Sequence, residues 1–341
     1  MQTLSQAKLL RAQPARPAAS ADEGRPPCCF SIDFEDYAHD FQRALGVSRP
    51  RHAPHSLWKA YERIERFAQE RLAGGRLTFF TTGQVARDHP DIVRRIASDG
   101  HEVACHYYEH DQIWHQNRDT LRHNLDLALE HLCNASGQVI KGFRAPDFSI
   151  DDRCASWTYE ELSRFFIYDS SLVAVGPPGS AAHPHVFRFP GSILHEFPIV
   201  VRRLAPGVAV RVVGGTYLRV LPIATIMRLL RDVWAAGYLP HVYLHPYDIL
   251  DEYEQWSSFA ELAELPMHRR CYWWARQHQW HTIGNRNALR KLARIFREFK
   301  HTGPMASLLG SEEDRGGKTG QSVATHLDAE GHAIASVEGA R

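Results

Sequence analysis

The sequence lacks any run of about 18 apolar residues, which is the length that a membrane-spanning helix requires. Residues 1–20 also lack the long apolar stretch of a secretory signal peptide. None of the six cysteines forms a C-x-x-C pair, and their irregular spacing is typical of reduced thiols in a reducing compartment. These absences predict a cytoplasmic protein without a transmembrane segment.

The chain also has almost no excess of charge of either sign. Its 341 residues include 40 Lys and Arg and 39 Asp and Glu, which gives a formal net charge of +1. This balance argues against nucleic acid as the main partner, because nucleic-acid-binding surfaces are usually strongly basic. One basic amphipathic segment, residues 287–300, is more simply interpreted as a helix packed on the body of the protein.

Composition divides the chain into three parts. Residues 1–25 are rich in Ala, Arg, Pro and Ser, and residues 310–341 are rich in Gly, Ser and charged residues. Neither segment shows apolar periodicity, so we predict a disordered leader and a disordered tail. Residues 26–309 contain no internal repeat or interdomain linker, which predicts one domain with a helical extension from about 251 to 309.

Short apolar runs alternate with amphipathic segments within this domain. The predicted strands are 26–34, 77–83, 101–106, 137–150, 165–172, 193–201, 208–215 and 238–249. The predicted helices are 56–73, 89–100, 117–135, 157–165, 221–237 and 265–300, and 173–187 reads as a loop. This alternation favours an α/β fold with a parallel sheet.

A metal-binding pattern occurs in GHEVACHYYEH, residues 100–110, where His106 and His110 stand four residues apart. That spacing lets two imidazoles point at one metal ion. Hydrolytic zinc sites use two or three His or carboxylate ligands and keep one position open for water. A third ligand must therefore come from another part of the chain.

The candidate third ligands lie in SIDFEDY, residues 31–37, where Asp33, Glu35 and Asp36 follow an apolar run. Taken alone, such carboxylates often cap a helix or face solvent. However, these carboxylates and the histidine pair each follow the end of a predicted parallel strand. His245 and Arg144 occur at two further strand ends. Side chains at the carboxyl ends of parallel strands converge, which predicts one site.

With these motifs, the sequence resembles the polysaccharide deacetylase family (carbohydrate esterase family 4, the NodB-homology domain) over roughly residues 28–250. Four motifs stand in the family's order: Ser31 to Tyr37, the GHE…H-x-x-x-H segment, R-x-P at Arg144 and Pro146, and L-H at Leu244 and His245. The chain is similar in particular to a subgroup from bacterial exopolysaccharide and exosortase gene clusters. The shared features are D-x-E-D-Y, YDSS at 168–171, R-F-P at 188–190 and an extension like 285–309.

The resemblance implies a distorted (β/α) barrel and a divalent metal, usually zinc. It also implies hydrolysis of N-acetyl groups on N-acetylhexosamine polymers or their precursors. By position, Asp33 corresponds to the general base, His245 to the general acid and Arg144 to the residue that orients the base. His106 and His110 correspond to the metal-binding histidines.

The first motif departs from the family pattern of two adjacent aspartates, because Phe34 and Glu35 separate Asp33 from Asp36. Asp36 is the favoured metal carboxylate, since Asp is the usual ligand, and Glu35 is the alternative.

The second motif also departs from the family, because Tyr107 follows the first histidine where a small residue is usual. Its ring would narrow the cleft or bind a sugar face. Trp114 and Pro146 complete the predicted substrate-binding residues, with packing as the alternative role for the two aromatic side chains.

Two rival functions remain at this point. One is a hydrolase of the same fold that opens a cyclic amide or ureide, and the other is a non-catalytic carbohydrate-binding relative. The intact His106, His110 and carboxylate set favours the deacetylase over the first, and Asp33, Arg144 and His245 favour it over the second. The sugar substrate, the identity of the metal and the oligomeric state stay open.

Overall fold

The computed structural model describes residues 24–47, 50–175, 186–205, 208–309, 325–327 and 333–335. The predicted disordered leader therefore lies almost entirely outside the described residues. Most of 310–341 does too, apart from the short paired strands β13 (Thr325–Leu327) and β14 (Ala333–Ala335). Within the described residues, no helix combines the length and apolar character needed to cross a bilayer.

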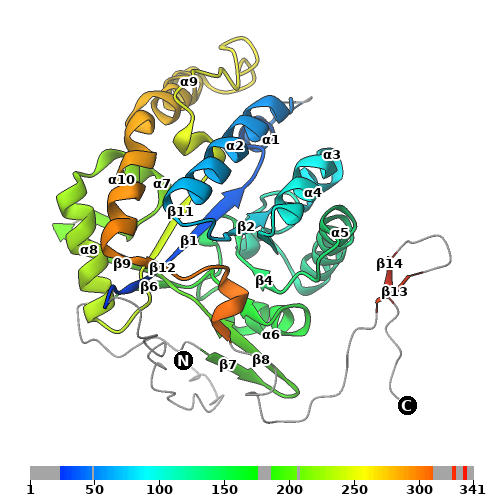
Figure 1. Ribbon diagram of the computed structural model, residues 1–341. Coiled ribbons are helices and arrows are strands. Elements are labelled where there is room, and N and C mark those ends of the chain that lie inside the picture. The colour runs from blue at the N-terminus through cyan, green and yellow to red at the C-terminus, as the bar shows by residue number, and fades with distance from the viewer. Residues whose placement is uncertain are drawn as a thin grey trace, which may run out of the picture.

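A mainly parallel sheet forms the centre of the molecule (Figure 1). Its strands lie in the order β11-β1-β2-β3-β4-β5-β8-β7, with β12 also paired to β1. Within this sheet the β7–β8 pair is antiparallel and the other pairs are parallel. The bounds are β1 (Pro27–Phe34), β2 (Thr78–Thr81), β3 (Glu102–Cys105), β4 (Gly142–Phe143), β5 (Tyr168–Asp169), β7 (Val186–Phe189), β8 (Ser192–Glu196), β11 (His241–Leu244) and β12 (Lys300–His301).

A second, three-stranded sheet completes the barrel. It contains β6 (Val173–Val175), β9 (Ile199–Ala205) and β10 (Val208–Val212) in the order β10-β9-β6. The chain passes directly from β5 in the first sheet to β6 in the second. At the other side, the Val213 amide donates to the His241 carbonyl at 3.1 Å, and the Tyr243 amide donates to the Val213 carbonyl at 3.2 Å. These bonds link the end of β10 to β11, so the strands form a closed but irregular ring, as the predicted distorted barrel requires.

Helices cover the outside of this ring (Figure 1). They are α1 (Tyr37–Ala44), α2 (Pro54–Arg71), α3 (Gly83–Asp88), α4 (Pro90–Ser98), α5 (Arg118–Ser136), α6 (Ala155–Phe165), α7 (Gly215–Val220), α8 (Ile223–Ala235), α9 (Met267–Thr282) and α10 (Asn285–Glu298). The ends of α5 follow from its sequence, because the Asn117 side chain caps its first turn and Gly137 ends it with φ +67°. The basic segment forms α10, whose apolar residues Leu292 and Ile295 are fully buried.

The structure corrects several predicted boundaries. The predicted strand 137–150 contains only the two-residue β4, and the predicted helix 221–237 is preceded by α7. The predicted strand 193–201 divides at Pro198 into β8 and β9, which belong to different sheets. Pro lacks the amide that would continue a ladder, so it suits this corner. The predicted loop 173–187 contains β6 and the start of β7, and its residues 176–185 lie outside the description.

Candidate active site

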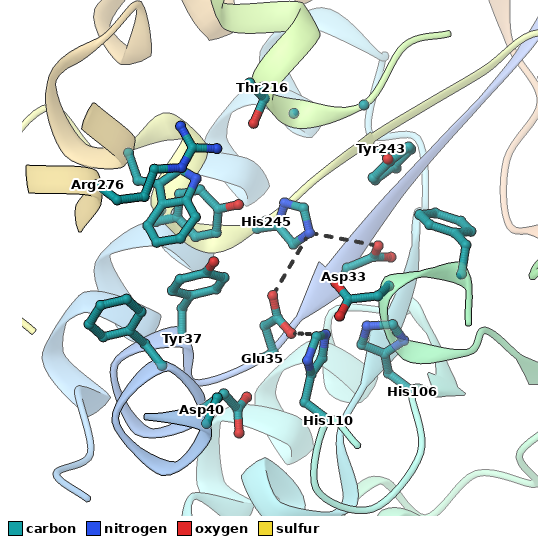
Figure 2. A pocket seen from close by; sticks show the side chains of 18 of the residues that line it. Asp33, Glu35, Tyr37, Asp40, His106, His110, Thr216, Tyr243, His245 and Arg276 are labelled. Carbon is teal, nitrogen blue, oxygen red and sulfur yellow. Dashed lines mark ion pairs between the residues drawn. The ribbon is translucent and has the colours of Figure 1, made fainter. Parts of the chain in front are cut away.

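The carboxyl ends of β1, β3 and β11 open into a cleft with a volume of about 590 Å³ (Figure 2). Its walls combine the chemically active side chains of the sequence motifs with aromatic and basic residues of later elements. Its lining includes Asp33, Glu35, Tyr37, Asp40, His106, His110, Asp147, Arg211, Tyr243, His245, Arg269, Trp273, Arg276 and Trp280.

Asp33 stands near the end of β1 and is 2% exposed. Its Oδ1 atom forms an ion pair and hydrogen bond with Nη1 of Arg144, which is itself fully buried. Burial by itself would raise the pKa of Asp33, but the charge and hydrogen bond of Arg144, together with the charges of His106 and His245, outweigh it and lower that pKa below its usual value. Asp33 is therefore held ionised, as a general base must be before it accepts a proton.

Residues on or next to several strands provide hydrogen-bond partners for the buried guanidinium of Arg144. Nη1 donates to Ser31 Oγ at 2.9 Å, and Nη2 donates to Ser170 Oγ at 2.9 Å and lies 3.2 Å from His241 Nε2. Nε donates to the Ser170 carbonyl at 3.3 Å. These contacts hold Arg144 in one orientation, so the position of the Asp33 carboxylate is determined by the barrel rather than by a flexible loop.

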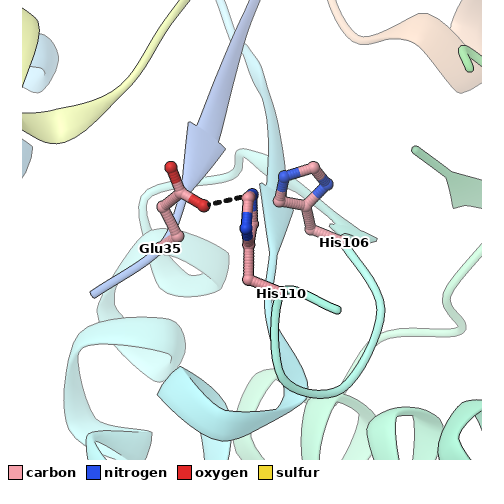
Figure 3. A group of neighbouring side chains, drawn as sticks. All are labelled: Glu35, His106 and His110. Carbon is pink, nitrogen blue, oxygen red and sulfur yellow. Dashed lines mark ion pairs between the residues drawn. The ribbon is translucent and has the colours of Figure 1, made fainter. Parts of the chain in front are cut away.

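Glu35, His106 and His110 form a group in which one ligand atom from each residue lies within 4.8 Å of the others. Glu35 belongs to the two-residue connection between β1 and α1, and the two histidines follow β3 (Figure 3). The Glu35 Oε2 atom is buried and forms an ion pair with His110 Nε2 at 2.6 Å. Such a convergence of ligand atoms fits a divalent metal ion.

The protonation states of the two histidines differ. Burial lowers the pKa of His106 to about 3, so this ring is neutral. Its Nδ1 lies 2.8 Å from the Arg144 carbonyl, which leaves Nε2 as the nitrogen available to an ion. Burial also disfavours charge on His110, but the charge and hydrogen bond of Glu35, with the charges of Asp40 and Asp147, outweigh it and raise the pKa of His110 to about 10. A metal ion would compete with that proton.

Asp36, the favoured metal carboxylate in the sequence, is not brought to this group. It is the N-cap of α1, and its Oδ1 accepts from the His39 amide at 3.3 Å. Its Oδ2 accepts from the Ala53 amide at 3.1 Å and lies 3.1 Å from His52 Nδ1. The alternative, Glu35, is the carboxylate that lies with the two histidines.

His245 follows β11 and reaches the same cleft (Figure 2). Its Nε2 lies 4.0 Å from Asp33 Oδ2 and 3.8 Å from Glu35 Oε1. Its Nδ1 lies 3.0 Å from Asp248 Oδ2, which fixes the ring and points Nε2 into the cleft. Burial would lower the pKa of His245, but the hydrogen bond and charge of Asp248 raise it to about 8. The ring is therefore largely protonated at neutral pH, as a general acid should be.

The three predicted substrate-binding residues do not line the cleft. Tyr107 has φ +66°, which turns its fully buried ring into the core, where its hydroxyl accepts from Asn124 at 2.8 Å. Trp114 packs against the core and under the Arg153 guanidinium at 4.4 Å. Pro146 is buried, although its neighbours in sequence do reach the cleft.

Sequence reasoning missed two sets of residues. The first set surrounds Arg144 and includes Ser31, Ser170 and His241. Of these three residues, Ser170 was indicated by the YDSS motif. The second set is the wall contributed by α9, which comes from the segment interpreted only as a helical extension. No periodicity within α9 indicates that it meets the barrel mouth, because that contact depends on the tertiary fold.

Two family models match the chain: polysaccharide deacetylase over residues 71–160, and a domain of unknown function (DUF3473) over residues 167–302. The peptidoglycan-N-acetylglucosamine deacetylase of Bacillus cereus is 31% identical over 128 residues, which cover 36% of this chain and 46% of that protein. A chitooligosaccharide deacetylase of Rhizobium leguminosarum bv. trifolii is 32% identical over 88 residues, covering 26% and 37%. The matched region thus spans less than half the length of these relatives.

The overall fold is also found among solved structures. Puue allantoinase superposes with a TM-score of 0.53 at 15% identity, over 90% of this chain and 96% of that chain. At this identity the likeness concerns the fold alone. His106, His110 and Arg144 lie within the polysaccharide deacetylase match, whereas His245 and α9 lie within the second match.

Proposed function

Because the chain belongs to the polysaccharide deacetylase family, we propose that it is a metal-dependent hydrolase that removes N-acetyl groups from an N-acetylhexosamine polysaccharide or its precursor. One observation carries this proposal: Asp33, clamped by Arg144, shares a cleft with the Glu35–His106–His110 group and with His245. The relatives named as deacetylases act on peptidoglycan and chitooligosaccharides, which supports an N-acetylated sugar as the substrate class.

Glu35, His106 and His110 are the proposed metal ligands. A set of two imidazoles and one carboxylate suits zinc better than the hard cations, which prefer oxygen ligands. When bound, such an ion lowers the pKa of water and polarises the acetamide carbonyl. This set also favours the deacetylase over relatives that open cyclic amides without a metal.

Asp33 and His245 divide the proton transfers between them. Asp33 accepts a proton from the attacking water, and Arg144 keeps its carboxylate ionised and oriented for that step. His245 donates its Nε2 proton to the departing amine, while Asp248 holds the opposite ring nitrogen. Acetate and a free amino sugar result. The separation of the two groups, 4.0 Å between Oδ2 and Nε2, lets both reach one acetamido group.

The test is acetate release from short N-acetylglucosamine oligomers by protein that has been treated with chelator and then supplied with zinc. We expect zinc to restore release, and His106→Ala to abolish both release and stoichiometric zinc binding. His123→Ala is the matched control, because His123 is exposed on α5 and does not line the cleft. Bound zinc without release from any N-acetylated sugar would contradict the proposed function.

A further inference from the structure

Helix α9 presents one regular stripe of side chains to the cleft. Arg269, Trp273, Arg276 and Trp280 all line it, and their spacing of i, i+4, i+7 and i+11 places them on one helix face. The two arginines are two turns apart, or about 10 Å along the axis. Cations and indole rings therefore alternate along one wall, and the segment lies within the domain of unknown function.

These two arginines form no ion pair with a carboxylate among the residues that the structure describes. Arg276 donates to the neutral Gln279 side chain, and its guanidinium lies 4.7 Å above the Trp280 ring. By contrast, Arg219 pairs with Asp248 at 2.7 Å. The contacts of Arg276 orient its charge without neutralising it.

A third guanidinium, that of Arg211, lines the same cleft. It donates to the Asp147 backbone carbonyl at 3.4 Å, hydrogen-bonds to the Tyr243 side chain and lies 5.0 Å from the Phe148 ring. Figure 2 shows Arg276 across the cleft from His106 and His110, with His245 between them. Arg276 therefore lies apart from the proposed metal ligands, whereas the charge of Arg211 lies close to the Asp147 carboxyl and helps to lower its pKa.

The carboxylates of the cleft belong to the side opposite α9 or have other partners. Asp33 is paired with Arg144 and Glu35 with His110. Asp40, which Figure 2 shows beside His110, lies 3.4 Å from the His39 ring, and Asp147 accepts from Gln112 at 2.9 Å. None of them forms an ion pair with the arginines of α9 in the described part of the chain.

We propose that Arg269 and Arg276 form a subsite for an anionic group, a carboxylate or a phosphate, carried by the N-acetylated substrate. Guanidinium groups bind both anions through paired N–H donors. Trp273 and Trp280 support this wall, because both rings pack against Phe41, with ring centroids 6.0 and 5.9 Å apart. The inference rests on the proposed function, since it names the class of substrate that the deacetylase site receives: an acidic rather than a neutral N-acetylated saccharide.

The experiment compares three probes on the zinc-loaded protein. They are neutral N-acetylglucosamine oligomers, oligosaccharides that alternate N-acetylglucosamine with glucuronic acid, and the diphosphate-linked uridine diphosphate N-acetylglucosamine. The second and third probes distinguish a carboxylate from a phosphate. We expect kcat/KM for one acidic probe to exceed that for the neutral oligomer at least about tenfold, the factor typical of one charge-assisted hydrogen bond.

Variants then test which residues cause the preference. Arg269→Gln and Arg276→Gln should each lower kcat/KM for the acidic probe about tenfold and leave that for the neutral oligomer unchanged. Arg276→Lys should keep most of the preference, because it retains the charge. Arg290→Gln is the control, since Arg290 is exposed on α10 and hydrogen-bonds to Asn287 of the same helix.

Equal kcat/KM for acidic and neutral probes would overturn the inference, and so would Gln variants that impair both kinds of probe equally. If no probe is hydrolysed, the same comparison is made by calorimetric binding. Tighter binding of an acidic probe that Arg276→Gln abolishes would then support the subsite while the proposed function fails. Absence of any such difference in binding would remove the subsite as well.

Discussion

Replacing Arg144 by methionine should destabilise the protein strongly, because it leaves the Asp33 carboxylate buried without its cation. Arg144 is fully buried and Asp33 is 2% exposed, so water cannot replace the lost partner. Removing one member of a buried ion pair costs about 3–5 kcal/mol. The change also removes the cation from its place 4.0 Å above the Phe80 ring, a contact worth up to about 2 kcal/mol when desolvated.

The assay is urea unfolding of the metal-free protein, followed by circular dichroism. A double variant, Arg144→Met with Asp33→Asn, supplies the decisive comparison. If the unpaired charge causes the loss, adding Asp33→Asn to the Arg144→Met variant should recover about 2 kcal/mol or more of unfolding free energy, although the double variant stays inactive. The conservative change Asp33→Asn alone completes the double-mutant cycle.

The dependence on pH gives the same reasoning a second test. In the native protein the pKa of Asp33 is lowered, so its contribution to stability is present above the ordinary carboxyl pKa, near 4, and is lost as pH falls further. Without Arg144, burial raises the pKa of Asp33 instead. The gap in unfolding free energy between native protein and variant should therefore narrow as pH falls towards 4. A loss below about 1 kcal/mol, or a gap independent of pH, would refute the argument.

Three further predictions concern the cleft. Asp248→Asn should move the alkaline limb of the kcat/KM profile, expected near pH 8, to lower pH, because His245 must be protonated and Asp248 helps to raise its pKa to about 8. A pH–rate series measures this, and an unmoved limb would exclude His245 as the acid. Glu35→Gln should weaken zinc binding at least about tenfold, as measured by chelator competition. Asp36→Ala should keep zinc in the same assay, and thermal unfolding should show a loss of about 1 kcal/mol of stability, because Asp36 caps α1. The reverse pattern would restore Asp36 as the ligand. Tyr107→Phe should leave KM within about twofold and lower the free energy of unfolding by about 1 kcal/mol, because the Tyr107 hydroxyl hydrogen-bonds to Asn124. A raised KM would indicate that Tyr107 contacts the substrate after all.

Much of the candidate site could be predicted from the positions of apolar runs and of the polar residues that end them. Apolar runs that stop at Asp33, His106 and His245 mark the ends of parallel strands, and such ends must meet at one edge of a barrel. Arg144 joins them for the same reason, even though its strand is reduced to two residues. The sequence by itself therefore determined which motifs share a cleft, and the polar residues that it singled out at strand ends are close together in the structure.

Only the tertiary structure decided between neighbours that the sequence left equivalent. Glu35 faces the histidines and Asp36 caps α1, because β1 ends at Phe34 and the connection to the helix is two residues long. The Tyr107 side chain points into the core because its backbone has a positive φ, which the sequence pattern did not predict. The α9 wall depends on a segment far beyond the histidine motif in sequence folding back over the barrel mouth, and long-range contacts of this kind leave no periodic signal in sequence.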